Sequence, residues 1–242
     1  MSVTDRPATL EESSPLQSVV LEELGSAKNY TAWIAAITGR WLGDSPIEIG
    51  SGHGEAAPHW VSDGRTVTTS EADPVRLGVL HERYDDHESI TVRELKVPIR
   101  ESASHSAVVA LNVLEHIEDD VEALRDFARL VEPGGRIVLV VPAFEFAMSN
   151  FDRENGHHRR YRLSTMEAAL RAAGLRPLEL RYVNAVGLIG WTLVVKLLRG
   201  RPRDGALLRV FDRFFVPVLR RIEGLVRPPF GQSVLAVAEK PS

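Results

Sequence analysis

Hydrophobic residues recur at helical spacing in the first part of the chain and then give way to a short apolar run. Between residues 27 and 42 we expect a helix whose apolar face carries Tyr30, Trp33, Ile34, Ile37 and Trp41. An earlier helix is predicted to begin at Ser14, because a proline follows this serine directly. The apolar run 46–49 ends at a glycine-rich segment, which is typical of a buried strand that enters a tight turn.

Six further strands are predicted to alternate with helices along the rest of the chain. The strands are expected at residues 66–70, 90–97, 107–111, 136–141, 178–182 and 233–238. Helices should begin after Asp73, at Asp119–Asp120 and at Ser164, whose capping box would include Glu167. Pro133–Gly135 should stop the second of these helices. Strands that alternate with helices predict an α/β fold with a seven-stranded, mostly parallel, doubly wound sheet.

A helical insertion is expected at residues 185–230, because about 50 residues between the last two strands are too many for a plain loop. The insertion holds nine Lys or Arg residues and three acids. On a helical wheel one side carries Leu207, Phe211, Phe214, Val218, Ile222 and Leu225. The opposite side carries Arg209, Arg213, Arg220 and Arg227. Pro217 should kink or split this helix.

The amphipathic pattern of the insertion has two interpretations, which the sequence leaves open. A basic face opposite an aromatic and aliphatic face is typical of a helix at a membrane surface. In that case the apolar segment 187–198, with Trp191, could dip into the membrane beside it. Alternatively, the apolar face packs on the α/β body as a substrate lid. Both interpretations predict an amphipathic or apolar substrate.

Composition narrows the function classes and the compartment. The 242 residues carry a net charge of −4, which is not the balance of a general nucleic-acid binder. The chain has no cysteine, which removes disulfides, Cys-based zinc sites and thiol nucleophiles, and no metal ligand is predicted. We expect residues 1–13 to be a disordered tail without signal-peptide features, and residues 14–242 to form one domain. No apolar run reaches the ~18 residues of a membrane span, so the expected location is the cytoplasm or the inner face of the membrane.

The glycine-rich segment after the first strand is the first candidate for chemistry. Gly50, Gly52 and Gly54 would let the backbone turn sharply and approach a ligand. Glu71 follows Gly50 by 21 residues, at the end of the second strand, where an acid can bind ribose hydroxyls. A dinucleotide fingerprint would need a third glycine at position 55, which is Glu55. The pattern therefore favours a nucleotide-like ligand other than NAD.

The segment Glu48–Gly54 resembles motif I of class I S-adenosylmethionine (SAM) dependent methyltransferases, which have a Rossmann-like fold. Two later segments extend the resemblance in the expected order. Residues 112–117 (NVLEHI) are similar to the "LEHI" segment of that superfamily, and residues 130–138 (LVEPGGRIV) are similar to its "L-x-PGG" passage. The "GHxRRY" and "PPFGQS" runs resemble a bacterial branch of type 11/12 methyltransferases.

The resemblance implies roles for particular residues in binding SAM. The three glycines of the motif would line the methionine portion, and Glu48 would support their loop and approach the cofactor. Glu71 would bind the ribose hydroxyls, with Ala72 beside the adenine. Asn112 and Val113 would flank the sulfonium.

One further implied contact and two departures complete the comparison. Tyr30 would close over the carboxylate end of SAM. The acid that often follows the third strand is missing, since Lys96 stands near that place, and Ala107 replaces an aspartate at the start of the fourth strand. These departures leave the adenine contacts open.

The segment Asp152–Tyr161 is the most unusual polar stretch and follows the fifth strand, where this superfamily often builds its substrate entrance. Methyl transfer depends on positioning, and an oxygen acceptor would gain from a base with a pKa near neutrality. His157 or His158 could serve as that base. Alternatively, the stretch is a solvated basic loop that clamps the following helix. His116 is expected to orient a helix start.

The leading hypothesis is a SAM-dependent methyltransferase that acts on a small-molecule or lipid-linked acceptor. The alternative is a SAM-fold protein that binds ligand without methylating, such as a cyclase or scaffold. A nucleic-acid partner is not expected, because Asn112-Val-Leu-Glu115 differs from the "(D/N)PPY" run of amino-methylating DNA enzymes. The acceptor atom and the oligomeric state stay open.

Overall fold

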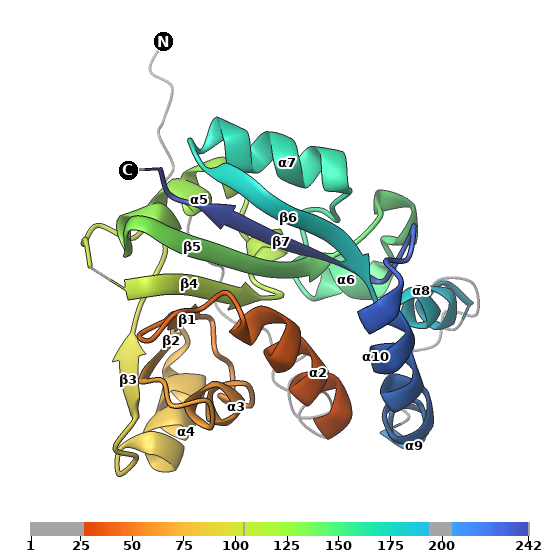
Figure 1. Ribbon diagram of the computed structural model, residues 1–242, viewed down its shortest axis with the longest axis horizontal. Coiled ribbons are helices and arrows are strands. Elements are labelled where there is room, and N and C mark those ends of the chain that lie inside the picture. Colours follow the sequence, from red (N-terminus) through yellow and green to blue (C-terminus); the bar gives the residue numbers. More distant parts are fainter. Residues whose placement is uncertain (1–26, 104, 194–204, 242) are drawn as a thin grey trace.

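A seven-stranded sheet forms the centre of the computed structural model, which describes residues 27–103, 105–193 and 205–241 (Figure 1). The strands are β1 (Ile47–Ile49), β2 (Val67–Glu71), β3 (Ile90–Glu94), β4 (His105–Leu111), β5 (Val131–Pro142), β6 (Arg176–Val183) and β7 (Ser233–Glu239). Their spatial order is β3-β2-β1-β4-β5-β7-β6, and only β7 runs antiparallel to its neighbours. The predicted mostly parallel, Rossmann-like sheet is confirmed.

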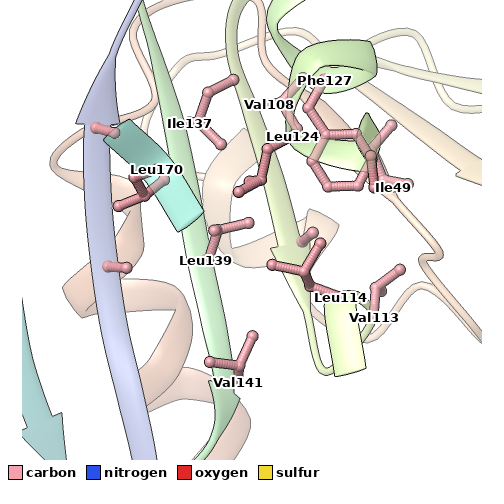
Figure 2. Close-up of a cluster of buried hydrophobic side chains, with 14 of the residues drawn as sticks. Ile49, Val108, Val113, Leu114, Leu124, Phe127, Ile137, Leu139, Val141 and Leu170 are labelled. Atoms are coloured by element: carbon pink, nitrogen blue, oxygen red, sulfur yellow. The ribbon is translucent and has the colours of Figure 1, made fainter. Parts of the chain in front are cut away.

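Helices cover both faces of the sheet. One face is packed by α2 (Lys28–Gly39), α3 (Ala57–Val61) and α4 (Pro74–Tyr84), through Ile34, Trp60 and Leu80 among others. The other face is packed by α5 (Asp120–Arg129) and α7 (Leu163–Ala172). Figure 2 shows Leu124 and Phe127 of α5 and Leu170 of α7 against side chains of β4 and β5. Because helices cover both faces of the sheet, the central strands are almost wholly apolar.

Two predicted helix boundaries are wrong. The helix predicted at Ser164 begins at Leu163, where the Thr165 hydroxyl accepts a hydrogen bond from the Arg162 amide. Glu167 is not part of a capping box, because its carboxylate pairs with Arg171 one turn later. The segment Pro133–Gly135 does not stop α5, which has already ended at Arg129, and it lies within β5 instead.

The predicted insertion contains helices in its described part. They are α8 (Ala185–Trp191), α9 (Gly205–Val210), the π-helical turn η4 (Phe211–Phe215) and α10 (Val216–Leu225). Pro217 lies in the first turn of α10, just after the π-helical turn. Proline has no backbone N–H, so it cannot donate a hydrogen bond to the preceding turn, and the helical pattern is irregular there. The predicted tail and the helix at Ser14 lie outside the described residues, as do residues 194–204 of the insertion.

The packing of the insertion differs from the lid interpretation. The face turned toward the body consists of Asp212, Val216, Leu219 and Glu223, all of which are buried. Most of the predicted apolar face points outward instead, since Phe214, Val218, Ile222 and Leu225 are exposed. Phe211 of that face is half-buried and packs against the cluster around Trp33. The lid interpretation was wrong about which face packs inward, because the buried carboxylates of Asp212 and Glu223 hold the opposite face of the helix against the body. None of the helices in the described ranges is both long and apolar enough to cross a membrane.

Candidate active site

The glycine loop lies at the carboxyl edge of the sheet, where β1, β2 and β4 end side by side. Gly50, Gly52 and Gly54 all adopt positive φ angles, of 65°, 57° and 77°. A Cβ atom on Gly50 would lie 2.8 Å from Cγ2 of Val113, so the loop can pass the end of β4 only with glycine at this position. The structure therefore brings the glycine loop and Val113 together, as predicted.

Glu71 organises the region beside this loop. Its carboxylate accepts hydrogen bonds from the amide nitrogens of Gly52 (3.0 Å), Ala72 (2.9 Å) and Asp73 (3.1 Å). Arg76 lies 3.1 Å from the same carboxylate; the Glu71 side chain is buried, and that of Arg76 is 12% exposed. Two other guanidinium nitrogens of Arg76, Nε and Nη1, are buried without a hydrogen-bond partner among the described residues. Glu71 thus joins the loop to an arginine that still has donors to offer.

Glu48 is buried just before the loop and has unused acceptor capacity. Its side chain is 3% exposed, and its Oε2 atom has no hydrogen-bond partner among the described residues. Burial raises the pKa of Glu48 to about 8, with Ser51 opposing the shift and Glu71 adding to it. SAM carries an ammonium, a sulfonium and ribose hydroxyls. An unpartnered carboxylate oxygen and unpartnered guanidinium donors at one sheet edge fit such a ligand.

Two further predicted cofactor residues lie outside the glycine loop, one after β4 and one on α2. Asn112 follows β4 with φ at 54°, a conformation that L-residues with side chains rarely adopt, and its amide donates to Val140. Tyr30 lies on α2, and burial raises its pKa. Its hydroxyl interacts with Ser233 and Asn184, at the ends of β7 and β6. The side-chain hydrogen bonds of Tyr30 are therefore made on the β6–β7 side of the edge.

The two candidate histidines have different environments. The Nδ1 atom of His157 lies 3.2 Å from Oδ1 of the buried Asp152, which is within ion-pair distance but without hydrogen-bond geometry. Although burial alone would raise it, the neighbouring His157 and the charge of Arg160 lower the pKa of Asp152. His158 has an exposed side chain, and its amide nitrogen donates to the Glu115 carbonyl. An aspartate behind a histidine ring is the arrangement that orients a general base, so His157 is the better candidate.

Two residues of the NVLEHI segment join His157 in a cluster that the sequence did not predict. One carboxylate oxygen of Glu115 and one ring nitrogen each of His116 and His157 lie within 4.8 Å of one another. Glu115 is fully buried, and neither of its side-chain oxygens has a hydrogen-bond partner among the described residues. Burial raises the pKa of Glu115 to about 7, whereas burial and the neighbouring His157 lower the pKa of His116 to about 3. No metal was expected, but these three groups could hold a divalent cation.

The cluster could have been anticipated from strand order. Glu115 and His116 follow β4, and His157 follows β5, and these two strands are parallel neighbours. Their carboxyl ends therefore meet at one edge. The interpretation of His116 as a helix-start residue missed this, because it considered only the local sequence.

Aromatic side chains lie in and beside the segment 143–161, which follows β5. Phe144 stacks on Tyr182 with ring centroids 4.7 Å apart and contacts Phe146. Trp191 of α8 packs edge-on against Phe151, and the Arg160 guanidinium lies 5.0 Å from its ring centroid. Such a group suits a flat or apolar ligand.

Comparisons with known proteins identify the family of the chain. A family model described as a methyltransferase domain matches residues 27–180. The 27-O-demethylrifamycin SV methyltransferase of Amycolatopsis mediterranei (strain S699) is 27% identical over 242 residues, covering 93% of this chain and 87% of that protein. The ubiquinone biosynthesis O-methyltransferase of Klebsiella pneumoniae (strain 342) is 29% identical over 112 residues, 43% of this chain and 45% of that protein. The chain thus spans less than half the length of this second relative.

Solved structures show the same fold at low sequence identity. Geranyl diphosphate C-methyltransferase from Streptomyces coelicolor A3(2), in complex with Mg²⁺, geranyl diphosphate and S-adenosyl-L-homocysteine, superimposes with a TM-score of 0.59. The match is 12% identical and covers 86% of this chain and 79% of that chain. The similarity supports the fold alone.

Proposed function

The chain belongs to the methyltransferase-domain family and is a SAM-dependent methyltransferase, and from this premise we propose that it methylates an oxygen atom of an apolar small-molecule or lipid-linked acceptor. The observation that carries the proposal is the pairing of His157 with the buried Asp152 at the carboxyl edge of the sheet. Two relatives that this chain resembles bear names of enzymes that methylate oxygen atoms.

The cofactor would be held by the residues that end β1, β2 and β4. Glu48 would offer its unpartnered oxygen to a cationic group, and Glu71 and Arg76 would bind hydroxyls. Gly50, Gly52 and Gly54 would give the backbone access, and Ala72, Asn112 and Val113 would complete the walls. Tyr30 would contribute from α2. When bound, SAM supplies the methyl group.

His157 would act as the general base toward the acceptor hydroxyl. A neutral imidazole accepts the hydroxyl proton while the acceptor oxygen forms its bond to the methyl carbon and the bond from that carbon to sulfur breaks. Asp152 would hold the ring in one tautomer and stabilise the imidazolium that forms. Its low pKa keeps it ionised for that role. The aromatic rings of Phe144, Phe151 and Trp191 would bind the apolar part of the acceptor and exclude water.

The test compares His157→Ala with His158→Ala, using labelled SAM and a panel of apolar phenols, enols and alcohols. Loss of a general base should lower kcat by about 10²–10⁴ while SAM affinity is unchanged. The exposed His158 provides the matched control and should retain turnover. Full activity of His157→Ala would remove it as the base. Activity that disappears in EDTA and returns with a divalent ion would instead favour a metal held by Glu115, His116 and His157.

A further inference from the structure

Exposed large hydrophobic side chains gather on the helical insertion. Twelve such side chains are exposed in the described part of the chain, and ten of them lie between residues 185 and 230. Leu225 is 89% exposed and Phe214 is 62% exposed. Figure 1 shows α9 and α10 at one edge of the molecule, next to α2 and α8. Exposed apolar side chains gathered on one segment in this way mark an interaction site.

The outward orientation of this surface is built into the fold by two buried acids. Asp212 accepts hydrogen bonds from the amide nitrogens of Asn29 (3.1 Å) and Tyr30 (2.8 Å), at the start of α2. Glu223 accepts from the amides of Asn184 (3.0 Å) and Ala185 (2.9 Å), at the start of α8. Turning the helix to bury its apolar face would break all four bonds and leave both helix starts without their acceptors. The apolar surface therefore stays outside.

The charges of the same helix are sorted by face. Its two acids, Asp212 and Glu223, both point inward. Its five arginines are all exposed, namely Arg209, Arg213, Arg220, Arg221 and Arg227. A hollow between α2 and α10 is lined by Asn29, Pro217, Arg220 and Arg221. The outer surface of residues 208–227 therefore combines apolar side chains with positive charge and carries no carboxylate of its own.

We propose that this surface, made of η4, α10 and the residues up to Phe230, docks on a bilayer that contains anionic phospholipids. Hydrophobic side chains would enter the acyl boundary, and the arginines would meet the phosphates, as in an interfacial helix. A second copy of the chain fits poorly, because a two-fold contact through this face would set five arginines against five. If the chain docks in this way, the acceptor is drawn from the membrane. This last step, unlike docking itself, rests on the proposed function.

The experiment measures co-sedimentation of the full chain with vesicles. Vesicles of phosphatidylcholine with about one third phosphatidylglycerol are compared with pure phosphatidylcholine, at low and high salt. We expect binding to the anionic vesicles that weakens with salt, because screening reduces the attraction. Each arginine at the surface contributes about a fivefold change in partitioning. The variant R209Q/R213Q/R220Q/R221Q should therefore bind about 600-fold more weakly.

The apolar contribution is tested by F214S/V218S/L225S, which should also lose vesicle binding. Two matched controls change similar residues elsewhere: Val75→Ser, an exposed apolar side chain on α4, and Arg171→Gln on α7. Both should bind like the native chain. Native chain that stays in the supernatant with every vesicle would overturn the proposal, as would variants that still bind. A dimer that Leu225→Ser dissociates, without vesicle binding, would assign the face to a second copy.

The readouts separate this inference from the proposed function. SAM affinity and turnover on a detergent-dispersed acceptor should be unchanged in both surface variants, which also shows that they are folded. If a surface variant loses vesicle binding but keeps its turnover, the lost property is docking and not catalysis. Native chain that binds vesicles but transfers no methyl group to oxygen would leave docking intact and remove the proposed reaction.

Discussion

Buried acids occur both at the glycine loop and on the helical insertion, but their hydrogen bonding differs. Among the described residues, one oxygen of Glu48 has no hydrogen-bond partner, and Glu71 is paired with Arg76, two of whose nitrogens also lack a partner. On the insertion, both oxygens of Asp212 and of Glu223 accept backbone amides at helix starts. Buried polar groups are normally satisfied, so the unfilled capacity of Glu48 and Arg76 indicates a ligand, whereas the filled capacity of Asp212 and Glu223 indicates a structural role. Substitutions at the loop should therefore lower binding, and substitutions on the insertion should lower stability.

The largest effect is expected for Gly50→Leu, which should remove measurable SAM binding. Gly50 has a positive φ angle, and a side chain there would meet Val113 and displace the loop. Gly64→Leu is the matched control, because Gly64 also has a positive φ angle (87°) but faces open space. Titration calorimetry of both variants separates backbone strain from lost ligand space. Retained SAM binding by Gly50→Leu would place the cofactor elsewhere.

Glu71→Gln should weaken SAM binding by about 1.5–3 kcal/mol, the scale of a hydrogen bond to a charged group. The amide keeps the size of the side chain but cannot neutralise Arg76, so some loss of stability is also expected. Calorimetry gives the affinity, and thermal unfolding shows whether the variant is folded. An unchanged dissociation constant would mean that Glu71 only supports the loop.

Asp212→Asn should lower the free energy of unfolding by about 0.5–2 kcal/mol, because it weakens the acceptors at the start of α2. SAM affinity should change much less than in Glu71→Gln. Denaturant unfolding measures the first quantity, and Glu167→Gln, in an exposed ion pair, provides a control expected to cost about 0–1 kcal/mol. If Asp212→Asn instead lowered SAM affinity strongly at full stability, the contrast between the two regions would fail.

Much of this fold could be predicted from the sequence, because strand and helix patterns are local. The glycine loop, Glu71 and Val113 could be placed at the carboxyl ends of strands, because motif spacing reports which strands they follow. Other features depend on distant partners. Asp212 and Glu223 are acids on an otherwise basic, amphipathic helix, and only the positions of Tyr30 and Ala185 explain why they turn inward. A helical wheel ranks residues by hydrophobicity and cannot weigh buried hydrogen bonds, so it suggested the wrong inner face.

The cluster of Glu115, His116 and His157 escaped prediction for a related reason. His157 lies about 40 residues after Glu115 and His116 in the sequence, and the three meet only because β4 and β5 are adjacent. His157 and His158 were equivalent candidates in the sequence, since adjacent residues cannot be ranked without knowing which one faces Asp152.

The most direct test of the central claim is titration calorimetry of SAM against the native chain and Glu48→Gln between pH 6 and pH 8. Burial raises the pKa of Glu48 to about 8, so the free protein holds this group largely protonated at pH 6. A cationic ligand favours the ionised form, and linkage then requires SAM affinity to rise with pH in the native chain. The account predicts this rise and its absence in Glu48→Gln. SAM binding that is undetectable, or equally independent of pH in both proteins, would contradict it.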